Sequence, residues 1–319
     1  MGPDYSVGPH PRRRPVYSRK GRSGPVVEFI QQVVNGLSLG SIYALIAVGL
    51  TLIFGIARVG NFAHGDFMMV AAYAFVILLM DAGWGLPLAT LAAIVIAASL
   101  AFMVERLVFR RLYRAPGTTS FTAALGLSTA IQAGVIVVLS GTPRQVGGSW
   151  ISNVIQIGSI RISGPRAMAI VGSMIALGAL AAFLTIGKFG KAIRAVAQNN
   201  DAAQMVGIPI SRIRVITMLL AGVLAGWAAS LIAPIFGAMP SMGVLLTLKS
   251  MAIVIAGGLG SVGGALIGAY VLGISEALVA GYISHDFQHA LAFVLLAVFL
   301  LLRPGGMFGE GTVAMELRR

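Results

Sequence analysis

Long stretches without a charged residue constrain this chain more than any other feature. The first runs from Phe29 to Ala57, and later charge-free runs occur at 67–80, 82–104, 115–143, 167–187, 215–248, 250–275 and 287–302. A membrane-spanning helix needs about 20 mostly apolar residues, so most of these runs suit one helix each. The pattern predicts an all-α, polytopic membrane protein with eight spanning helices, nine or ten being possible, together with re-entrant or broken helical segments.

The composition agrees with this class and excludes several others. Of the 319 residues, 57% are hydrophobic and 10% are charged, whereas a soluble domain has about 25% charged residues. The chain has no Cys, which excludes disulfides and Cys-zinc sites. Its 41 Gly predict closely packed helices, because small residues let backbones approach. The first run exceeds the apolar core of a signal peptide, which is about 7–15 residues long, so we interpret it as a retained helix.

The chain divides into a membrane domain and two tails. Residues 1–25 are rich in Pro, Gly and basic residues, and we expect this basic N-terminal tail to be disordered. Residues 26–308 form the predicted transmembrane domain, which includes a cytoplasmic loop at 187–214. Residues 309–319 form a C-terminal tail.

Basic residues indicate how the helices are oriented. The net charge of +13 is concentrated at the ends of apolar runs, which is typical of cytoplasmic anchors rather than of nucleic-acid binding. Two apolar runs separate two basic clusters, so both lie on one side: Arg106, Arg110, Arg111 and Arg114, and Lys188, Lys191, Arg194, Arg212 and Arg214. The positive-inside rule makes that side cytoplasmic and puts the loop 141–166 outside.

The same count places both basic ends of the chain outside, against the rule. One explanation is an additional incomplete crossing in each half, for which the glycine-interrupted segments Gly55–Phe67 and Ala256–Gly268 are candidates. Such paired segments point to discontinuous helices and a transport site. The other explanation is that the N-terminal tail does lie outside. The sequence leaves both open.

The segment GNFAHGDF is the densest polar feature near membrane depth. It holds Asn61, His64 and Asp66 between glycines, which allow a helix to break and free backbone groups for a solute. Ionisable residues inside a membrane usually serve function, so these three are candidates for a translocation pathway. The alternative is a surface loop in which His64 and Asp66 are solvated.

Two isolated charges stand in the second half of the chain. Lys249 separates two apolar runs, and Glu276 follows VLGIS. Both could line a polar pathway. For Lys249 we favour the simpler interpretation that its side chain reaches a membrane interface. Glu276 is retained as a pathway candidate beside the alternative that it lies near a helix end.

The segment GKAIRAVAQNNDAAQMVGIP is polar, unlike its surroundings, and has helical spacing. Asn199 or Asn200 could cap a short helix that begins near Asp201, and Gly207 and Pro209 would end it. Connections between elements usually have about 4–6 residues, whereas this one exceeds twenty. A long, structured cytoplasmic loop favours a surface for a partner protein.

The sequence contains no motif for catalysis or for ATP hydrolysis. It has no GxxxxGK[ST] phosphate loop, no HExxH and no GxSxG. We therefore expect no enzyme activity, cofactor or metal site in this chain, and we expect any ATP hydrolysis to occur on another subunit.

Three segments resemble a known family when they are taken together. The segment DAAQMVG resembles the E-A-A-x-x-x-G coupling motif of ATP-binding-cassette importer permeases, with Asp201 in place of Glu and with Ala202, Ala203 and Gly207 matching. The stretches Asn35–Tyr73, 190–208 and 248–278 resemble the LivH-type permease of branched-chain amino-acid importers. The likeness covers most of 27–308.

The resemblance implies the function and the partners. It implies a multi-pass permease of the bacterial inner membrane that pairs with a second, LivM-like permease, two ATPase subunits and an extracytoplasmic binding protein. Asp201 to Gly207 would form the helix that docks into the ATPase. A urea or short-amide permease is a related alternative, and a passive channel or an ion-coupled carrier is the rival from another class.

Overall fold

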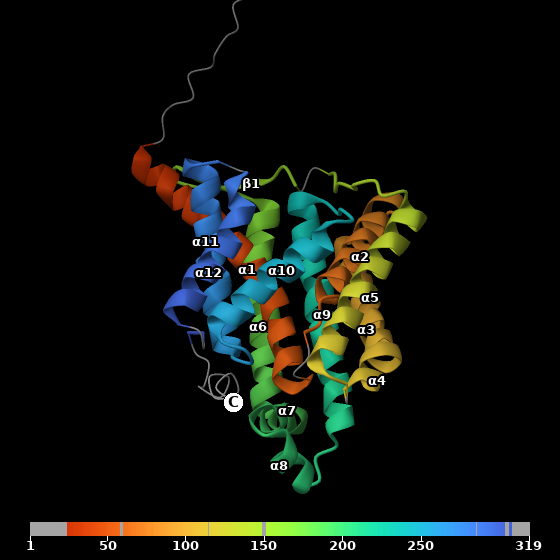
Figure 1. Ribbon diagram of the computed structural model, residues 1–319. Coiled ribbons are helices and arrows are strands. Elements are labelled where there is room, and N and C mark those ends of the chain that lie inside the picture. Colours follow the sequence, from red (N-terminus) through yellow and green to blue (C-terminus); the bar gives the residue numbers. More distant parts are fainter. Residues whose placement is uncertain are drawn as a thin grey trace, which may run out of the picture.

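The computed structural model of this protein is a bundle of long helices (Figure 1) and describes residues 24–57, 60–113, 115–148, 151–284, 286–303 and 306–307. Its first half contains α1 (Pro25–Ala57), α2 (His64–Val76), η1 (Ile77–Asp81), α3 (Leu86–Val104), η2 (Glu105–Phe109), α4 (Arg110–Leu112) and α5 (Gly117–Leu139). Its second half contains β1 (Val154–Ile157), β2 (Ile160–Ser163), α6 (Gly164–Ile186), α7 (Lys188–Gln198), α8 (Asn200–Met205), α9 (Ile210–Phe236), α10 (Met242–Gly257), α11 (Val262–Tyr282) and α12 (Phe287–Leu302).

Within the described residues, seven helices are long and apolar enough to cross a membrane. Two shorter apolar helices, at Met242–Gly257 and Ala290–Leu301, accompany them. The predicted all-α polytopic class is confirmed. The predicted eight to ten spanning helices stay a prediction, because the two shorter described helices fall below the length of a full crossing. The 1–23 part of the predicted N-terminal tail and the whole of 309–319 lie outside the described residues.

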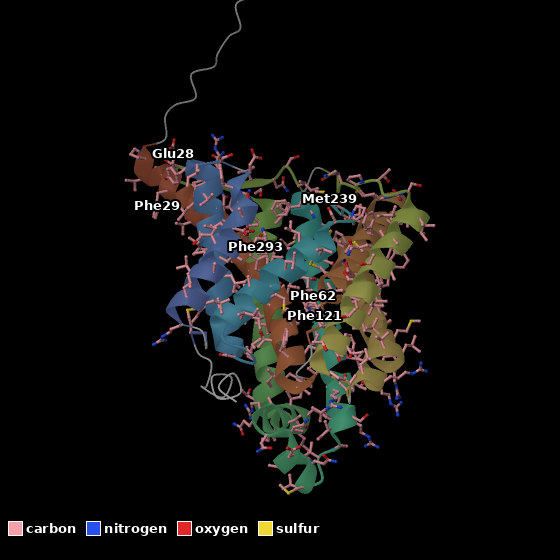
Figure 2. All side chains as sticks on the ribbon, in the orientation of Figure 1. Glu28, Phe29, Phe62, Phe121, Met239 and Phe293 are labelled. Carbon is pink, nitrogen blue, oxygen red and sulfur yellow. The ribbon has the colours of Figure 1, made fainter. Side chains whose placement is uncertain are left out.

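The bundle has two ends, which we name the α8 end and the hairpin end. Figure 1 shows α4, α7 and α8 at one end and β1 at the other. The two predicted basic clusters therefore lie at the same end, apart from Arg114, which is outside the described residues. Helix α1 begins at the hairpin end, where Figure 2 labels Glu28. The described chain thus enters the bundle on the side opposite to α8.

The two halves of the chain differ in how many helices run between the two ends of the bundle. In the second half, α9, α10, α11 and α12 return the chain to the α8 end (Figure 1), and the short helix α10 comes before the candidate segment Ala256–Gly268, which holds the turn into α11. In the first half, α1, α2 and α3 make three passes, and the start of α1 lies opposite the basic clusters. That the N-terminal tail lies outside stays a prediction, because residues 1–23 are not among the described residues.

Three of the predicted helix boundaries are correct and one is wrong. The segment Ala233–Pro240 ends α9 at Phe236, as expected. Breaks also occur after Ala57 and after Gly257, inside the two glycine-interrupted segments. Lys249 was expected to separate two spans, but it lies in the middle of α10.

Helices α1 and α9 form the centre of the bundle and pack through small residues. Helix α1 contacts α11, α9, α6 and α10, and α9 contacts α3, α1 and α2. A Cβ added to Gly273 of α11 would overlap the backbone of Gly40 in α1. A Cβ added to Gly226 of α9 would likewise overlap the backbone of Ala93 in α3. These approaches confirm that the glycines serve close helix packing.

A short antiparallel hairpin covers part of the hairpin end. Strands β1 and β2 pair from Val154 with Ser163 to Ile157 with Ile160. Gln31 of α1 donates to the carbonyl oxygen of Arg161 over 2.8 Å and accepts from its backbone N–H over 2.9 Å. The predicted outer loop is therefore fastened to the start of α1. Trp150 lies outside the described residues.

Candidate functional site

The break between α1 and α2 places a polar turn halfway between the two ends of the bundle. Figure 2 shows Phe62 at mid-height, well above α7 and α8. The Asn61 side-chain oxygen accepts from the backbone N–H of Ala63 over 3.1 Å, and its carbonyl accepts from that of His64 over 3.3 Å. Helix α2 therefore begins inside the protein, where protein atoms replace water as partners of its first N–H groups.

Two glycines bring the first turn of α2 against the first turns of α10. The Gly65 backbone N–H donates to Thr247 Oγ1 over 2.9 Å. A Cβ at Gly65 would overlap the carbonyl oxygen of Gly243, and a Cβ at Gly243 would overlap Asp66 Oδ1. Side chains larger than hydrogen at either position would thus separate the two broken-helix segments. The two halves of the sequence meet at this contact.

The three polar residues of the turn are buried and point to different neighbours. Asn61, His64 and Asp66 each have 0% exposed surface, so the alternative of a solvated surface loop is wrong. Asn61 Nδ2 donates to the Met218 sulfur of α9 over 3.7 Å. His64 faces α1, where a Cβ at Gly49 would lie 3.0 Å from its Nε2.

The Asp66 side chain points away from His64, toward α10 and α5. The side chains of Ser128 and Gln132 approach its carboxylate from α5, without completing a hydrogen bond with it. Both His64 ring nitrogens likewise lack a completed hydrogen bond among the described residues. Buried polar groups are hydrogen-bonded in the great majority of cases, so a turn with two such side chains is set up to receive further partners.

A compensated charge cluster lies on α10 within one turn of this contact. Lys249 Nζ lies 2.8 Å from Glu276 Oε1 and 2.9 Å from Oε2. Tyr43 of α1 donates to Glu276 Oε2 over 2.8 Å, and Lys249 Nζ donates to the Tyr43 hydroxyl over 2.9 Å. Lys249 is 1% exposed, so the interpretation that it reaches an interface is wrong. That Glu276 lines a pathway stays a prediction.

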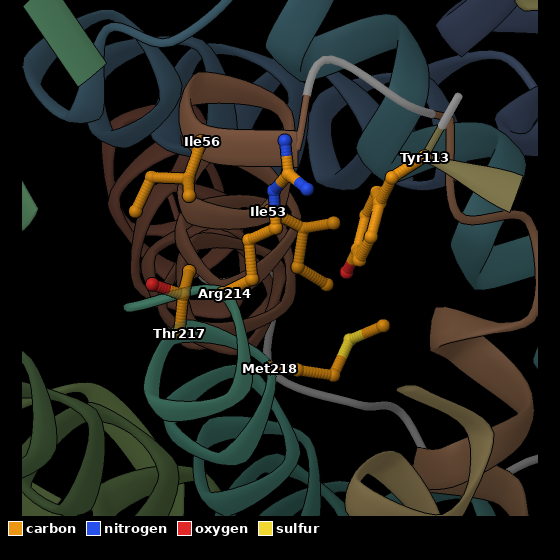
Figure 3. A pocket seen from close by; sticks show the side chains of 6 residues that line it. All are labelled: Ile53, Ile56, Tyr113, Arg214, Thr217 and Met218. Atoms are coloured by element: carbon orange, nitrogen blue, oxygen red, sulfur yellow. The ribbon is translucent and has the colours of Figure 1, made fainter. Parts of the chain in front are cut away.

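A narrow pocket lies between the last turn of α1, the first turns of α9 and Tyr113. Figure 3 shows its lining, with Arg214 between Ile56 and Tyr113 in this view; the lining residues are Ile53, Ile56, Tyr113, Arg214, Thr217 and Met218. The Arg214 guanidinium carbon lies 4.0 Å from the centre of the Tyr113 ring, which is a cation–π arrangement. Met218 both lines the pocket and contacts Asn61, so the pocket and the polar turn share this side chain.

Burial and a buried carboxylate set the state of Tyr113. Its hydroxyl faces the carboxylate of Glu105, which is 1% exposed and lies in the π-helical turn η2. Burial, reinforced by the Glu105 charge and hydrogen bond and opposed by Arg214, raises the pKa of Tyr113 well above its ordinary value. Tyr113 therefore stays a neutral hydrogen-bond donor beside Arg214 at neutral pH.

Helix α7 lies across the foot of α6 at the α8 end (Figure 1). It buries Gly190, Ile193 and Val196 against the bundle, and a Cβ at Gly190 would overlap carbonyl oxygens at the end of α6. The spacing of three between the buried residues is that of one helical face. Helix α7 is thereby fixed to the ends of the spanning helices.

Helix α8 projects beyond α7 and is capped at both ends. The Asn199 side-chain oxygen accepts from the Ala202 backbone N–H over 3.0 Å, which makes Asn199 the N-cap and leaves Asp201 exposed in the first turn. Gly207 ends the helix with φ +82°, a conformation that favours glycine. The apolar side chains of Met205 and Val206 are 82% and 76% exposed.

Sequence reasoning missed several residues that complete these arrangements. Ser128 and Gln132 lie within an apolar run and carry no charge, so nothing local singled them out. Tyr43 was missed for the same reason. The pairing of Lys249 with Glu276 could have been suspected from the sequence. Each is an isolated charge in an apolar stretch, and buried charges are usually paired with an opposite charge.

Among the described residues, no group of three or more His, Cys, Asp or Glu side chains could hold a metal ion. The arrangement consists of a buried polar turn, a paired charge cluster, a pocket and an exposed capped helix. None of these supplies a nucleophile beside a general base. Together they can hold a polar solute and contact a partner protein.

Comparison with known proteins gives a consistent result. Residues 32–302 match the family described as "Branched-chain amino acid transport system / permease component". The chain is 32% identical over 299 residues to the high-affinity branched-chain amino acid transport system permease protein LivH of Escherichia coli (strain K12), covering 89% of this chain and 97% of that protein. It is 31% identical over 301 residues to the corresponding permease protein BraD of Pseudomonas aeruginosa, covering 90% and 98%.

One solved structure supports the fold alone. It is described as PsaBC from Streptococcus pneumoniae in complex with Fab and aligns with a TM-score of 0.50 at 14% sequence identity. The alignment covers 92% of this chain and 100% of that chain.

Proposed function

Because the chain belongs to the family of permease components of branched-chain amino acid transport systems, we propose that it forms part of the path by which an ATP-driven importer moves branched-chain amino acids. The chain is a multi-pass membrane protein and a transport subunit rather than an enzyme. As an importer permease, it works with ATPase subunits. The substrate is proposed from that of the similar permeases LivH and BraD, which are named for branched-chain amino acid transport.

The proposed assembly contains the permease, a second LivM-like permease, two ATPase subunits and an extracytoplasmic binding protein. The observation that carries the coupling role is the exposed, doubly capped helix α8. Asp201 is exposed in its first turn, Ala202 is half-buried, Ala203 packs inward and Gly207 ends the helix, and its apolar tip stands beyond the basic end of the bundle. An exposed apolar tip on a structured loop suits a partner's cleft.

The polar turn is the proposed wall of the translocation pathway. Asn61, His64 and Asp66 lie beside Phe62, which is at mid-height, where the helix breaks, and Met218 is shared between this turn and the pocket near the α8 end. Glu276 is also buried, but Lys249 and Tyr43 hold its carboxylate. We therefore propose that Glu276 fixes α11 against α1 and α10.

The test is ATP-driven uptake of labelled leucine by the complete complex in proteoliposomes. Asp201→Lys and Gly207→Val should lower uptake and the amount of ATPase that co-purifies, because the first reverses a surface charge and the second strains a residue at φ +82°. Gly83→Val is a matched control, since Gly83 also has positive φ but lies in the turn before α3 at the other end of the bundle. Normal uptake and normal ATPase association in both α8 variants would contradict the coupling role.

The same assay separates the alternative substrates and mechanisms. Uptake of labelled urea in place of leucine would support the short-amide alternative. Leucine uptake that proceeds without ATP would support a passive channel or an ion-coupled carrier. We expect leucine uptake that requires both ATP and the binding protein.

A further inference from the structure

Asp66 is a buried carboxyl group without an ion-pair partner among the described residues. Its surface is 0% exposed, and neither carboxylate oxygen completes a hydrogen bond among the described residues. No Lys or Arg of the described chain forms an ion pair with it. An ionised carboxylate buried without a partner costs several kcal/mol, so this site requires either a proton or a cation.

The nearest buried charges on α10 and α11 do not neutralise Asp66. Lys249 lies two residues after Thr247 on α10, and its charge is matched by Glu276. The Lys249–Glu276 pair is therefore neutral overall, whereas Asp66 on the other side of Thr247 adds one negative charge at a similar depth. The protein thus leaves one unmatched anionic group beside its broken helices, and intramembrane groups of this kind usually serve function.

The groups around Asp66 fit a primary ammonium. Ser128 and Gln132 approach its carboxylate from α5, and Gln132 Nε2 donates to Ser128 Oγ over 3.0 Å. The two carboxylate oxygens of Asp66 and the hydroxyl oxygen of Ser128 can supply three acceptors, which is the number of donors on an ammonium group. Gln132 Nε2, by donating to Ser128 Oγ, holds that hydroxyl in place. Gly243 leaves the room that the carboxylate occupies.

Helix α5 covers this site and is weakly held by the rest of the chain. Among pairs of described elements, its substantial packing is against α2 alone. Phe121 of α5 stacks edge-on against Phe62 with 4.5 Å between ring centroids (Figure 2). The buried face is narrow and consists of Ser120, Ala124 and Ser128. A displacement of α5 would therefore expose Asp66 without disturbing the α1–α9 centre.

We propose that Asp66, Ser128 and Gln132 form the subsite that binds the ammonium group of the amino-acid substrate, and that movement of α5 opens it. The inference rests on the proposed function and adds the substrate group, its partners and the covering helix. An ammonium would neutralise Asp66 while bound, and its departure would restore the closed arrangement. Charged hydrogen bonds of this kind are about twice as strong as neutral ones.

The experiment compares Asp66→Asn with the unaltered complex in proteoliposomes. Asn has the shape of a protonated, neutral Asp but cannot ionise. It should therefore replace Asp66 if the residue acts only as a neutral structural group, and fail to replace it if the ionised carboxylate binds an ammonium group. We expect leucine uptake to fall about tenfold or more, as the loss of a charge-assisted hydrogen bond implies, with complex assembly and affinity for the binding protein unchanged. Asp81→Asn, which removes an exposed carboxylate from the same α2–η1 helix, should leave uptake unchanged.

A second variant tests the subsite independently, in case Asp66→Asn does not fold. Ser128→Ala combined with Gln132→Leu alters only the peripheral helix, and we expect it to raise the leucine concentration needed for half-maximal uptake by about threefold or more. Leucine uptake within twofold of the unaltered complex in Asp66→Asn, or in the double variant, would overturn the subsite. Failure of the unaltered complex to take up leucine would instead contradict the proposed function itself.

Discussion

Lys249 and Glu276 form an ion pair in which both side chains are buried, with 2.8 Å between Nζ and Oε1. The pair joins α10 to α11 across the break that separates them, and Tyr43 adds α1 through its hydroxyl. Burying two charges costs several kcal/mol per ion, which their mutual attraction and hydrogen bonds must offset. The partners therefore depend on each other more than an exposed pair does.

Removal of one partner of this pair should destabilise the protein strongly. Lys249→Met leaves the Glu276 charge buried without its cation, for which a loss of about 3–5 kcal/mol in the free energy of unfolding is expected. Adding Glu276→Gln removes that charge and should restore much of the lost stability. The denaturation midpoints of the purified single and double variants measure the two effects.

An exposed pair provides the control for this comparison. Arg144 and Asp81 form an ion pair at the hairpin end, with side-chain exposures of 35% and 55%. Because solvent screens such a pair, Asp81→Asn should change the free energy of unfolding by about 0–1 kcal/mol. A loss from Asp81→Asn as large as that from Lys249→Met, or a double variant no more stable than Lys249→Met alone, would contradict the assignment.

The contact between Gly65 and Gly243 should tolerate no added methyl group. Gly65→Ala places a Cβ on the backbone oxygen of Gly243, which no side-chain rotation can relieve, so overpacking by about 1–3 kcal/mol or more is expected. We expect a lower yield of folded protein and a lower denaturation midpoint. Gly178→Ala is the matched control, since a Cβ there meets nothing within 4 Å and alanine is the better helix former.

The parts of this structure that depend on neighbouring residues could be predicted from the sequence. Glycines at Gly55–Phe67 and Ala256–Gly268 predicted the two breaks, and Asn199 with Gly207 predicted the limits of α8. These features follow from backbone freedom and capping, which a short stretch of sequence determines. The charged runs likewise predicted which loops share an end of the bundle.

The parts that depend on distant partners could not be predicted in this way. Lys249 was assigned to an interface because the sequence alone does not show Glu276 beside it. The depth of Asp66 follows from the contact with α10, and its neighbours Ser128 and Gln132 come from a helix more than fifty residues later. Only the packing of whole helices brings these groups together, and single-sequence periodicity carries no such information.

The cap of α8 should control how well that helix holds its shape. Asn199→Ala removes the oxygen that accepts from the Ala202 N–H and should cost about 1 kcal/mol locally. The α8 amides should then exchange hydrogen about fivefold faster, as that free energy implies, while Asn199→Asp should retain most of the protection. Equal exchange rates in Asn199→Ala and the unaltered protein would show that the cap does not hold α8.

Tyr113, in the pocket at the α8 end, should make the stability of the folded protein decline at alkaline pH. Folding raises the pKa of Tyr113 above its ordinary value of 10.0, chiefly through burial and then through Glu105. Between the unfolded and folded pKa values, the folded protein binds one more proton than the unfolded protein. The contribution of Tyr113 to stability is therefore complete below about pH 10 and declines as the pH rises further.

Tyr113→Phe should remove this part of the alkaline destabilisation. The variant keeps the ring that faces the Arg214 guanidinium at 4.0 Å but has no proton to lose, so its stability should fall less between about pH 10 and 11 than that of the unaltered protein. Tyr270→Phe provides a control for a tyrosine elsewhere in the bundle. Thermal midpoints recorded at successive pH values measure the difference. Parallel curves for Tyr113→Phe and the unaltered protein would show that the Tyr113 hydroxyl does not set the alkaline limit.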